Sequence, residues 1–359
     1  MSKSPCVARS SQPLSRRQFL GGAGAAVAST LLPVRAGAAL RAARRSAPLA
    51  WGYLMHLGTH FWADRDTPMW REYAPTDTLR CEPVFWREIV GTAAKAGVNM
   101  IVVDLLEGVR YRSHPELAIK GSWSPEMLRE ELARMRELGI EPIPKLNFST
   151  AHDTWLGEYG RMVSTSVYYE VCSDLIAEAI SLFDKPRFLH LGMDEETAEH
   201  QRDYAHATIR QHELWWHDLA FLVSEVEKAG VRAWVWSDYE WHHPELFYAH
   251  MPRSVLQSNW YYDDAFGPTV DRAKTYDNLD MRYYDQIPTG SNWHYPDNFV
   301  KTVEYCRDRV DPQRLKGFLQ TTWVATVSAA RHRHEGALAA VARARAAWDS
   351  RREDLKANS

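Results

Sequence analysis

Two adjacent carboxylates, Asp194 and Glu195, lie near the end of the segment FLHLGMDEE, which spans residues 188–196. Before the acids, this short apolar segment carries His190 and passes through Gly192. Adjacent carboxylates in a poorly solvated site repel each other, so the pKa of one rises and a protonated acid stands beside an ionised partner near neutral pH. Hydrolysis of a glycosidic bond needs this division, because an acid protonates the leaving oxygen while negative charge stabilises an oxocarbenium-like centre. The segment therefore indicates acid–base chemistry on a sugar.

The elements that must position this pair are predicted by the pattern of the chain. From Leu49 onward, short runs rich in β-forming residues alternate with longer stretches of helical periodicity such as HELWWHDLAFLVSEVEKAG. A doubly wound sheet usually has fewer strands, and its glycine fingerprint is missing here, so the alternation predicts an α/β fold of the (β/α)8 TIM-barrel type. We expect one catalytic domain over residues 49–359. Its strands are expected at residues 50–57, 99–105, 141–147, 187–192, 231–237, 254–260, 281–286 and 315–322.

Side chains that carry chemistry gather at the predicted strand ends. In a TIM barrel the catalytic groups lie where strands end and the following loops begin. Acidic, amide and aromatic residues occupy these positions: Asp104, Glu107, Asn147, Asp194, Glu195, Trp236, Asp238, Asn259, Trp260, Tyr284, Asp285 and Trp323. At the predicted strand starts, only Glu141 is acidic and none is aromatic. Flat rings at strand ends can stack on the apolar face of a sugar, so this distribution favours a carbohydrate site.

The acidic segment resembles the H-x-G-G-D-E hallmark of the family 20 glycoside hydrolases, the β-N-acetylhexosaminidases. His190, Gly192, Asp194 and Glu195 match this motif, and Met193 replaces its second glycine. The resemblance implies that Glu195 is the general acid/base. It also implies that Asp194 orients the 2-acetamido group of the substrate, which acts as the nucleophile in that family.

Other segments resemble the barrel of the same family. Residues 140–157 (IEPIPKLNFSTAHDTWLG) are similar to its third-strand segment, which would place His152 near the acid. The aromatic and acidic residues after strands five to eight are similar to the lining of its acetamido pocket. The candidate substrate-binding residues are His152, His190, Asn147, Trp236, Asp238, Trp260, Tyr284, Asp285 and Trp323.

Departures from the family pattern keep other functions open. The loop after the first strand reads HLGTHFWADRD and has no counterpart of the family's sugar-binding arginine, and Ala325 stands where the family has a glutamate. A non-catalytic carbohydrate-binding barrel is therefore an alternative. If the substrate lacks an acetamido group, a second carboxylate has to be the nucleophile or base. The candidates by position are Asp238, Glu240, Asp285 and Asp104.

A metal-dependent hydrolase is a second alternative. Four histidines would have to gather with Asp194 or Asp238: His56, His60, His152 and His190. However, the first strand carries H-x-x-x-H where amidohydrolase-type barrels carry H-x-H, and no H-E-x-x-H is present. We therefore expect no metal and no other cofactor.

The acids could also have no catalytic role and simply begin a solvated helix at DEETAEH, with acidic residues in its first turn. This interpretation explains the acids but not the histidine and glycine before them.

The N-terminal residues are typical of an export signal. Arg16 and Arg17 precede the apolar run GGAGAAVASTLLPV, and a small-residue cleavage site follows at residues 36–38. The run is shorter than the roughly 20 residues of a membrane-spanning helix, so no stable membrane insertion is expected. We predict a twin-arginine signal at residues 1–38 and a linker at 39–48. The folded protein would leave through the twin-arginine translocation machinery and act in the periplasm or outside the cell.

Composition and charge limit the partners. Hydrophobic residues make up 45% of the 359 residues and charged residues 25%, as in ordinary globular proteins. The formal net charge is −3, and residues 1–38 contain five basic and no acidic side chains, which leaves −8 on the remainder. This balance excludes a strongly basic nucleic-acid-binding protein. The expected partner is an oligosaccharide or glycoconjugate substrate.

Overall fold

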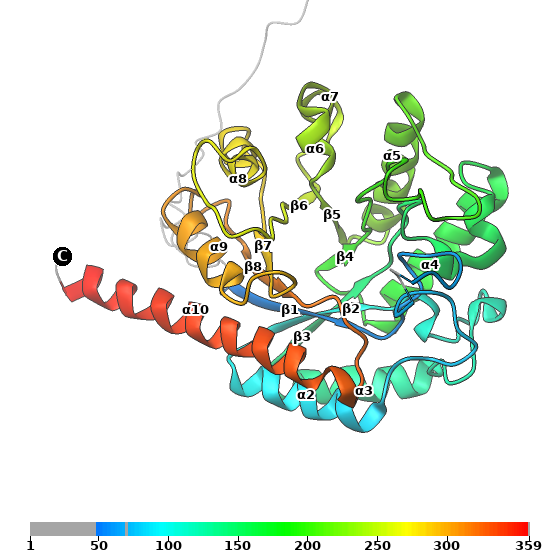
Figure 1. Cartoon of the computed structure of the whole chain (residues 1–359), viewed down its shortest axis with the longest axis horizontal. Coiled ribbons are helices and arrows are strands. Elements are labelled where there is room, and N and C mark those ends of the chain that lie inside the picture. Colours follow the sequence, from blue (N-terminus) through cyan, green and yellow to red (C-terminus); the bar gives the residue numbers. More distant parts are fainter. Residues whose placement is uncertain (1–47, 69–70, 358–359) are drawn as a thin grey trace, which may run out of the picture. The chain divides into compact units, whose positions relative to one another are not determined.

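Eight parallel strands form a barrel in the computed structural model, which describes residues 48–68 and 71–357 (Figure 1). The strands are β1 (Ala50–His56), β2 (Met100–Asp104), β3 (Glu141–Lys145), β4 (Phe188–His190), β5 (Arg232–Trp236), β6 (Leu256–Ser258), β7 (Thr289–Ser291) and β8 (Gly317–Thr321). They are paired in the order β6-β5-β4-β3-β2-β1-β8-β7. Bridges from Gln257 to Gln286 and from Trp260 to Thr289 bring the two edges of the sheet together. The architecture is the (β/α)8 TIM barrel that the sequence predicts.

Helices surround the strands (Figure 1). They are α2 (Pro83–Lys95), α3 (Pro125–Glu137), α4 (Ser166–Leu182), α5 (Glu213–Lys228), α6 (Tyr239–His242), α7 (Pro244–His250), α8 (Asp271–Met281), α9 (Asn298–Arg307) and α10 (Arg331–Ala357). Short 3-10 turns lie in the loops at Leu106–Gly108, Pro115–Leu117, Thr154–Arg161 and Ser328–Ala330. No helix in the described part of the chain is long and apolar enough to span a membrane.

Local sequence signals explain where the helices begin and which face they bury. The hydroxyl of Ser124 accepts a hydrogen bond from the backbone N–H of Met127 at 3.2 Å, which caps α3. Helix α5 turns Trp215, Leu219 and Leu222 inward, at the three- to four-residue spacing of one helical face. These contacts fix the helices against the strands, so the strand ends are held in a defined ring.

The seventh strand lies later in the chain than the sequence predicts. We expected it at residues 281–286, but Met281 ends α8 and β7 begins at Thr289. The alternating run MRYYDQ has β-propensity, yet its first residue completes the helix and Tyr283 takes a left-handed conformation (φ 64°) in the turn that follows. Residues 284 and 285 therefore lie before β7 and not after it.

Part of the predicted domain organisation lies outside the described residues. This applies to the signal at residues 1–38 and to the linker at residues 39–48 apart from its last residue. The described residues, from residue 48 onward, belong to one compact unit.

Candidate active site

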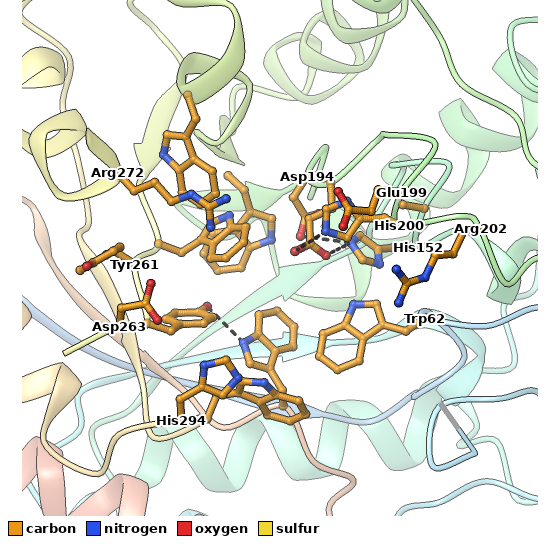
Figure 2. A pocket seen from close by; sticks show the side chains of 18 of the residues that line it. Trp62, His152, Asp194, Glu199, His200, Arg202, Tyr261, Asp263, Arg272 and His294 are labelled. Carbon is orange, nitrogen blue, oxygen red and sulfur yellow. Dashed lines mark hydrogen bonds and ion pairs between the residues drawn. The ribbon is translucent and has the colours of Figure 1, made fainter. Parts of the chain in front are cut away.

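A pocket of about 330 Å³ opens at the carboxyl ends of the strands (Figure 2). All the loops that follow the strands contribute to it except the one after β2. Its lining residues are Trp62, Ala151, His152, Asp194, Glu195, Glu199, His200, Arg202, Asp203, Trp236, Trp241, Trp260, Tyr261, Tyr262, Asp263, Arg272, Trp293, His294 and Trp323. The acid pair from the segment after β4 thus lies in a pocket rich in aromatic side chains.

A strained turn places the two acids. Gly192, Met193 and Glu195 all have positive φ values, at 71°, 70° and 56°. Left-handed backbone in non-glycine residues is costly and is concentrated at functional sites. A Cβ on Gly192 would lie 1.9 Å from Oδ1 of Asn147, so this position needs glycine for space as well as for conformation. The turn therefore depends on close contact with the segment after β3.

Asp194 is held by that neighbouring segment. Nδ2 of Asn147 donates to Oδ1 of Asp194 at 2.9 Å, and the hydroxyl of Ser149 donates to its backbone carbonyl. Oδ2 of Asp194 lies 3.3 Å from Nε2 of His152. Asn147 itself is buried beneath the pocket and does not line it. Its position makes it a support for Asp194.

Two imidazoles flank Glu195. Its Oε2 lies 3.3 Å from Nε2 of His152, and its Oε1 lies 3.3 Å from Nε2 of His200. Burial alone raises the pKa of Glu195, but hydrogen bonds and charges from the two histidines hold it well below its ordinary value. Burial alone lowers the pKa of His152, but Asp194 and Glu195 raise it to about 10. At neutral pH, His152 is therefore protonated and Glu195 is ionised.

Asp238 is a third buried carboxylate beside the pair. Its Oδ2 accepts a hydrogen bond from the backbone N–H of Glu195 at 2.9 Å, and its Oδ1 accepts one from Nε1 of Trp260 at 3.2 Å. Burial and the charge of Asp194 raise the pKa of Asp238. The other candidates for a second carboxylate have different surroundings. Glu240 is bonded by Tyr248, Thr275 and Asn278, and Asp104 pairs with Lys145 inside the barrel at 2.7 Å.

Aromatic rings surround the acids. The structure places the predicted Trp236, Trp260 and Trp323 in the pocket wall. It adds rings that sequence reasoning missed: Trp62, Trp241, Trp293 and Tyr262. Trp62 lies 5.6 Å from Trp323 and 5.5 Å from Trp293 between ring centroids. A signal for Trp62 was present, since it lies in the loop after β1, whereas Trp293 was hidden because β7 was placed too early.

A buried glutamate supports the loop that carries Trp62. The carboxylate of Glu107 accepts hydrogen bonds from the backbone N–H groups of Thr59 and His60 at 2.7 and 3.2 Å. The hydroxyl of Tyr204 donates to the carbonyl of Phe61 at 2.9 Å. The loop whose sequence departs from the family is thus tied both to the segment after β2 and to the long segment after β4.

Five predicted substrate-binding residues do not line the pocket. Asn147 and Asp238 contact the acid pair from behind the pocket wall. The other three are His190, Tyr284 and Asp285. His190 is fully buried in β4, with its ring 4.3 Å from that of Trp236. Tyr284 and Asp285 lie at the opposite end of the barrel because they precede β7. Tyr284 is buried and donates to the carbonyl of Met251 at 2.8 Å, and Asp285 pairs with Arg232, at the start of β5, at 2.8 Å.

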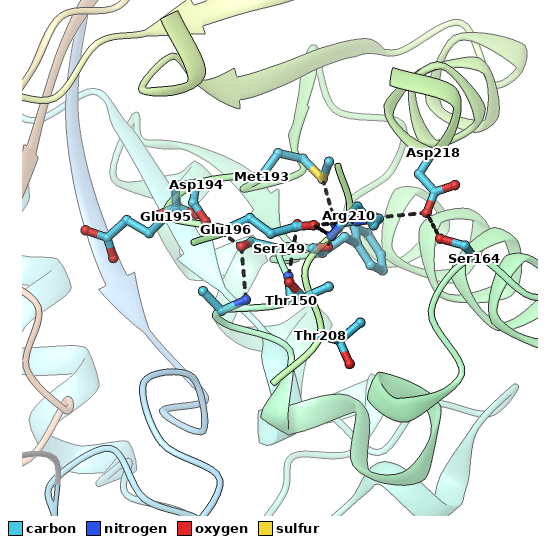
Figure 3. Close-up of polar contacts among 12 residues, drawn as sticks. Ser149, Thr150, Ser164, Met193, Asp194, Glu195, Glu196, Thr208, Arg210 and Asp218 are labelled. Carbon is cyan, nitrogen blue, oxygen red and sulfur yellow. Dashed lines mark hydrogen bonds and ion pairs between the residues drawn. The ribbon is translucent and has the colours of Figure 1, made fainter. Parts of the chain in front are cut away.

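Behind the acids, a buried ion-pair group anchors the same turn (Figure 3). Glu196 points away from Glu195 toward Arg210, which donates to its two oxygens at 2.9 and 2.6 Å. Arg210 also donates to Asp218 of α5 at 3.2 Å and to the carbonyl of Phe148 at 2.7 Å. Sequence reasoning missed this group, because nothing in the spacing of these residues indicates that they meet.

One side-chain group in the described part of the chain has donor atoms close enough to hold a metal ion. His152, Asp194 and Glu195 offer ligand atoms within 4.8 Å of one another. The group does not include His56 or His190, so the four-histidine cluster that a metallohydrolase would need is not assembled here. His56 lies 3.3 Å from Asp104 instead.

Comparison with known proteins gives two findings. Residues 13–33 match the family model of the twin-arginine translocation (TAT) pathway signal sequence. This match indicates export across the membrane by the TAT machinery and supports the predicted signal. No curated protein sequence matches the chain significantly.

The described fold is similar to solved structures of family 20 enzymes. A GH20 exo-β-N-acetylglucosaminidase from Vibrio harveyi has 14% identity and a TM-score of 0.54, over 82% of this chain and 54% of that one. A GH20 β-N-acetylhexosaminidase from Streptomyces coelicolor A3(2) has 14% identity and a TM-score of 0.56, over 82% and 64%. A β-N-acetylhexosaminidase from Bacteroides fragilis NCTC 9343 has 15% identity and a TM-score of 0.53, over 76% and 60%. The chain thus spans less than two thirds of the length of these structures, and at such identities the likeness establishes the fold.

Proposed function

We propose that the chain is an exported glycoside hydrolase that releases a β-linked 2-acetamido sugar from an oligosaccharide or glycoconjugate, in the periplasm or outside the cell. The observation that carries the proposal is the adjacent pair Asp194 and Glu195, both 3.3 Å from one imidazole nitrogen in an aromatic pocket. The fold shared with solved hexosaminidases and the TAT signal match support it.

Glu195 is the general acid/base in this proposal. In the free site Glu195 is ionised, and the proton that a leaving group needs lies on Nε2 of His152, 3.3 Å away. A bound sugar excludes water and raises the pKa of Glu195, because desolvation disfavours the carboxylate charge. The proton then passes from His152 to Oε2 of Glu195 and on to the glycosidic oxygen as the C–O bond breaks.

Asp194 orients the nucleophile. Asn147 and His152 fix its carboxylate, which can accept the N–H of a 2-acetamido group. That contact turns the acetamido carbonyl oxygen toward the anomeric carbon, where it forms the new bond as the leaving oxygen departs. The negative charge of Asp194 also stabilises the positive charge that develops on the sugar and the acetamido group.

The aromatic rings bind the sugar and keep water out. Trp236, Trp260 and Trp323 line the pocket that holds the acids, and Nε1 of Trp323 donates to the hydroxyl of Tyr262 at 3.1 Å. Stacking of a pyranose ring on indole faces provides binding energy that is independent of the hydroxyl-binding arginine and glutamate absent from this chain.

A matched substrate panel with Glu195→Gln tests the proposal. We expect wild-type protein to hydrolyse aryl β-glycosides that carry a 2-acetamido group and not those with a 2-hydroxyl group. Glu195→Gln should lower kcat by about 10²–10⁴-fold, most strongly for substrates with poor leaving groups, because general acid catalysis is lost. Glu130→Gln, a change in an exposed residue of α3, is the control, and the melting temperature of both variants should stay near that of wild type.

Two other results would reject this proposal in different ways. Saturable oligosaccharide binding by wild-type protein without turnover would establish the non-catalytic sugar-binding barrel. Equal turnover of glycosides with and without the acetamido group would remove the orienting role of Asp194 and require a second catalytic carboxylate, for which Asp238, in contact with Glu195, is the candidate.

A further inference from the structure

Arg272 is a cation in the pocket wall that the proposed chemistry does not use. It lies in the first turn of α8, and its side chain is exposed to the pocket. Figure 2 shows it reaching into the pocket from the side opposite Arg202. Its guanidinium carbon lies 4.5 Å from the ring centroid of Trp241, so the charged plane is packed on an indole.

A buried amide fixes both members of this stack. Asn259, which is fully buried after β6, accepts a hydrogen bond from Nε1 of Trp241 at 2.9 Å. Its Nδ2 donates to the backbone carbonyl of Arg272 at 2.8 Å. The stacked pair is therefore anchored from the barrel wall and does not rest on loop contacts alone.

The charge of Arg272 is available to a ligand. None of the ion pairs found among residues 48–68 and 71–350 includes Arg272, whereas Arg202 on the other side of the pocket lies 3.8 Å from Asp203. Among residues 48–68 and 71–350, no hydrogen bond from its guanidinium N–H groups is found either, so these donors remain for a ligand. Their fork geometry matches the paired oxygens of carboxylates and sulfates.

A short series of contacts relates Arg272 to the acid pair. The rings of Trp241 and Trp260 lie 4.5 Å apart, and Trp260 donates to Asp238, which accepts the backbone N–H of Glu195. Two indoles thus separate the cation from the cleavage position. A group bound by Arg272 would therefore belong to the sugar next to the 2-acetamido sugar that is released.

We propose that Arg272 and Trp241 form a subsite for an anionic substituent, a carboxylate or a sulfate ester, on the neighbouring sugar of the substrate. This inference rests on the proposed glycoside hydrolase function and names its substrate class. Asp194, Glu195 and Asp263 would repel an anionic sugar that entered the pocket elsewhere. The fixed cation on this side of the pocket therefore selects both the substrate and its direction of binding.

Matched disaccharides test the subsite. Each carries a cleavable β-linked 2-acetamido sugar on a neutral sugar, on its 6-sulfated form or on the corresponding uronic acid. We expect the kcat/KM of the wild type to be at least ~10-fold higher for one or both anionic disaccharides than for the neutral one. One charge-assisted hydrogen bond contributes a factor of this size. Arg272→Gln should abolish this preference, so that the ratio of kcat/KM for the anionic disaccharides to kcat/KM for the neutral one falls to about 1. The sulfate and carboxylate arms identify which anion is preferred.

Lys274→Gln is the matched control, because it removes the same charge from the same helix at an exposed position outside the pocket. Its anionic preference should equal that of wild type. Hydrolysis without any anionic preference, or a preference that survives Arg272→Gln, overturns the subsite while the proposed function stands. If no disaccharide is hydrolysed, calorimetric binding of the same compounds decides the subsite independently: anionic binding must weaken at least ~10-fold in Arg272→Gln.

Discussion

His152 and His200 both contact Glu195, but their surroundings differ. His152 is buried and also contacts Asp194, whereas the side chain of His200 is 43% exposed and has Thr197 as its other partner, at 2.8 Å. His152 can therefore hold a proton inside the site, and His200 can exchange protons with solvent. Both imidazoles favour the ionised form of Glu195, so removal of either should raise the pKa of this acid.

The expected effect of His200→Gln follows from this rise in the pKa of Glu195. In the proposed mechanism Glu195 must be protonated to act as the acid, and a higher pKa keeps it protonated to higher pH. The alkaline limb of the pH profile of kcat should therefore move to higher pH in the variant. The measurement is kcat against pH on an aryl 2-acetamido-β-glycoside. His206→Gln, an exposed change in the same segment, should leave the profile in place, and an unchanged or acid-shifted limb in His200→Gln would contradict the assignment.

The segment from β4 to α5 is the element on which the site depends most. It carries the acid pair on one side of a left-handed turn and Glu196 on the other. Arg210 joins Glu196 to Asp218, and the side chains of all three are almost completely buried. Because one arginine serves both acids, its removal leaves two buried carboxylates without the cation that both contact.

Arg210→Met should therefore be costly. We expect a loss of about 3–5 kcal/mol in the free energy of unfolding, measured by urea denaturation, together with a fall in kcat as the turn at Asp194 and Glu195 loosens. Arg343→Met breaks an exposed pair with Asp297 and should cost no more than about 1 kcal/mol. Equal losses in the two variants would show that the buried group does not hold the turn.

The success of the sequence prediction varied with the element. The β4 segment was recognisable because its apolar run, glycine and acids follow one another directly in the sequence. In the structure they form a strand, a turn and the acid pair in the same order. The seventh strand was misplaced because the run at residues 281–286 is compatible with both a helix end and a strand. That choice is made by packing: Tyr284 is buried against Tyr248 and Phe247, which no local pattern shows. The error placed Tyr284 and Asp285 in the predicted site, and it concealed Trp293.

At the scale of the whole molecule, the barrel makes a site from residues far apart in the chain. Trp62 and Trp323 come from the loops after the first and last strands and lie 5.6 Å apart. Sequence periodicity predicts that such loops converge, since parallel strands in a ring end on one face. It does not predict that Arg210 pairs with Glu196 or that Arg272 stacks on Trp241, because side-chain pairing between loops depends on the final packing.

The pH dependence of the stability of the whole barrel should reflect the protonation of the buried His152. Its pKa is raised to about 10 in the folded protein, from an ordinary value near 6.5, because Asp194 and Glu195 outweigh the effect of burial. A raised pKa contributes stability that is complete below the unfolded pKa and is lost as pH rises toward the folded one.

Wild type should therefore exceed His152→Gln in melting temperature most clearly near pH 6, and the difference should shrink steadily as the pH approaches 10. Differential scanning calorimetry of the two proteins across this range measures it. His332→Gln, an exposed change near the start of α10, should show the same small difference from wild type at every pH. A His152→Gln difference that stays constant or grows with pH would mean that this imidazole is neutral in the folded protein, and the proton assigned to the acid pair would have to lie elsewhere.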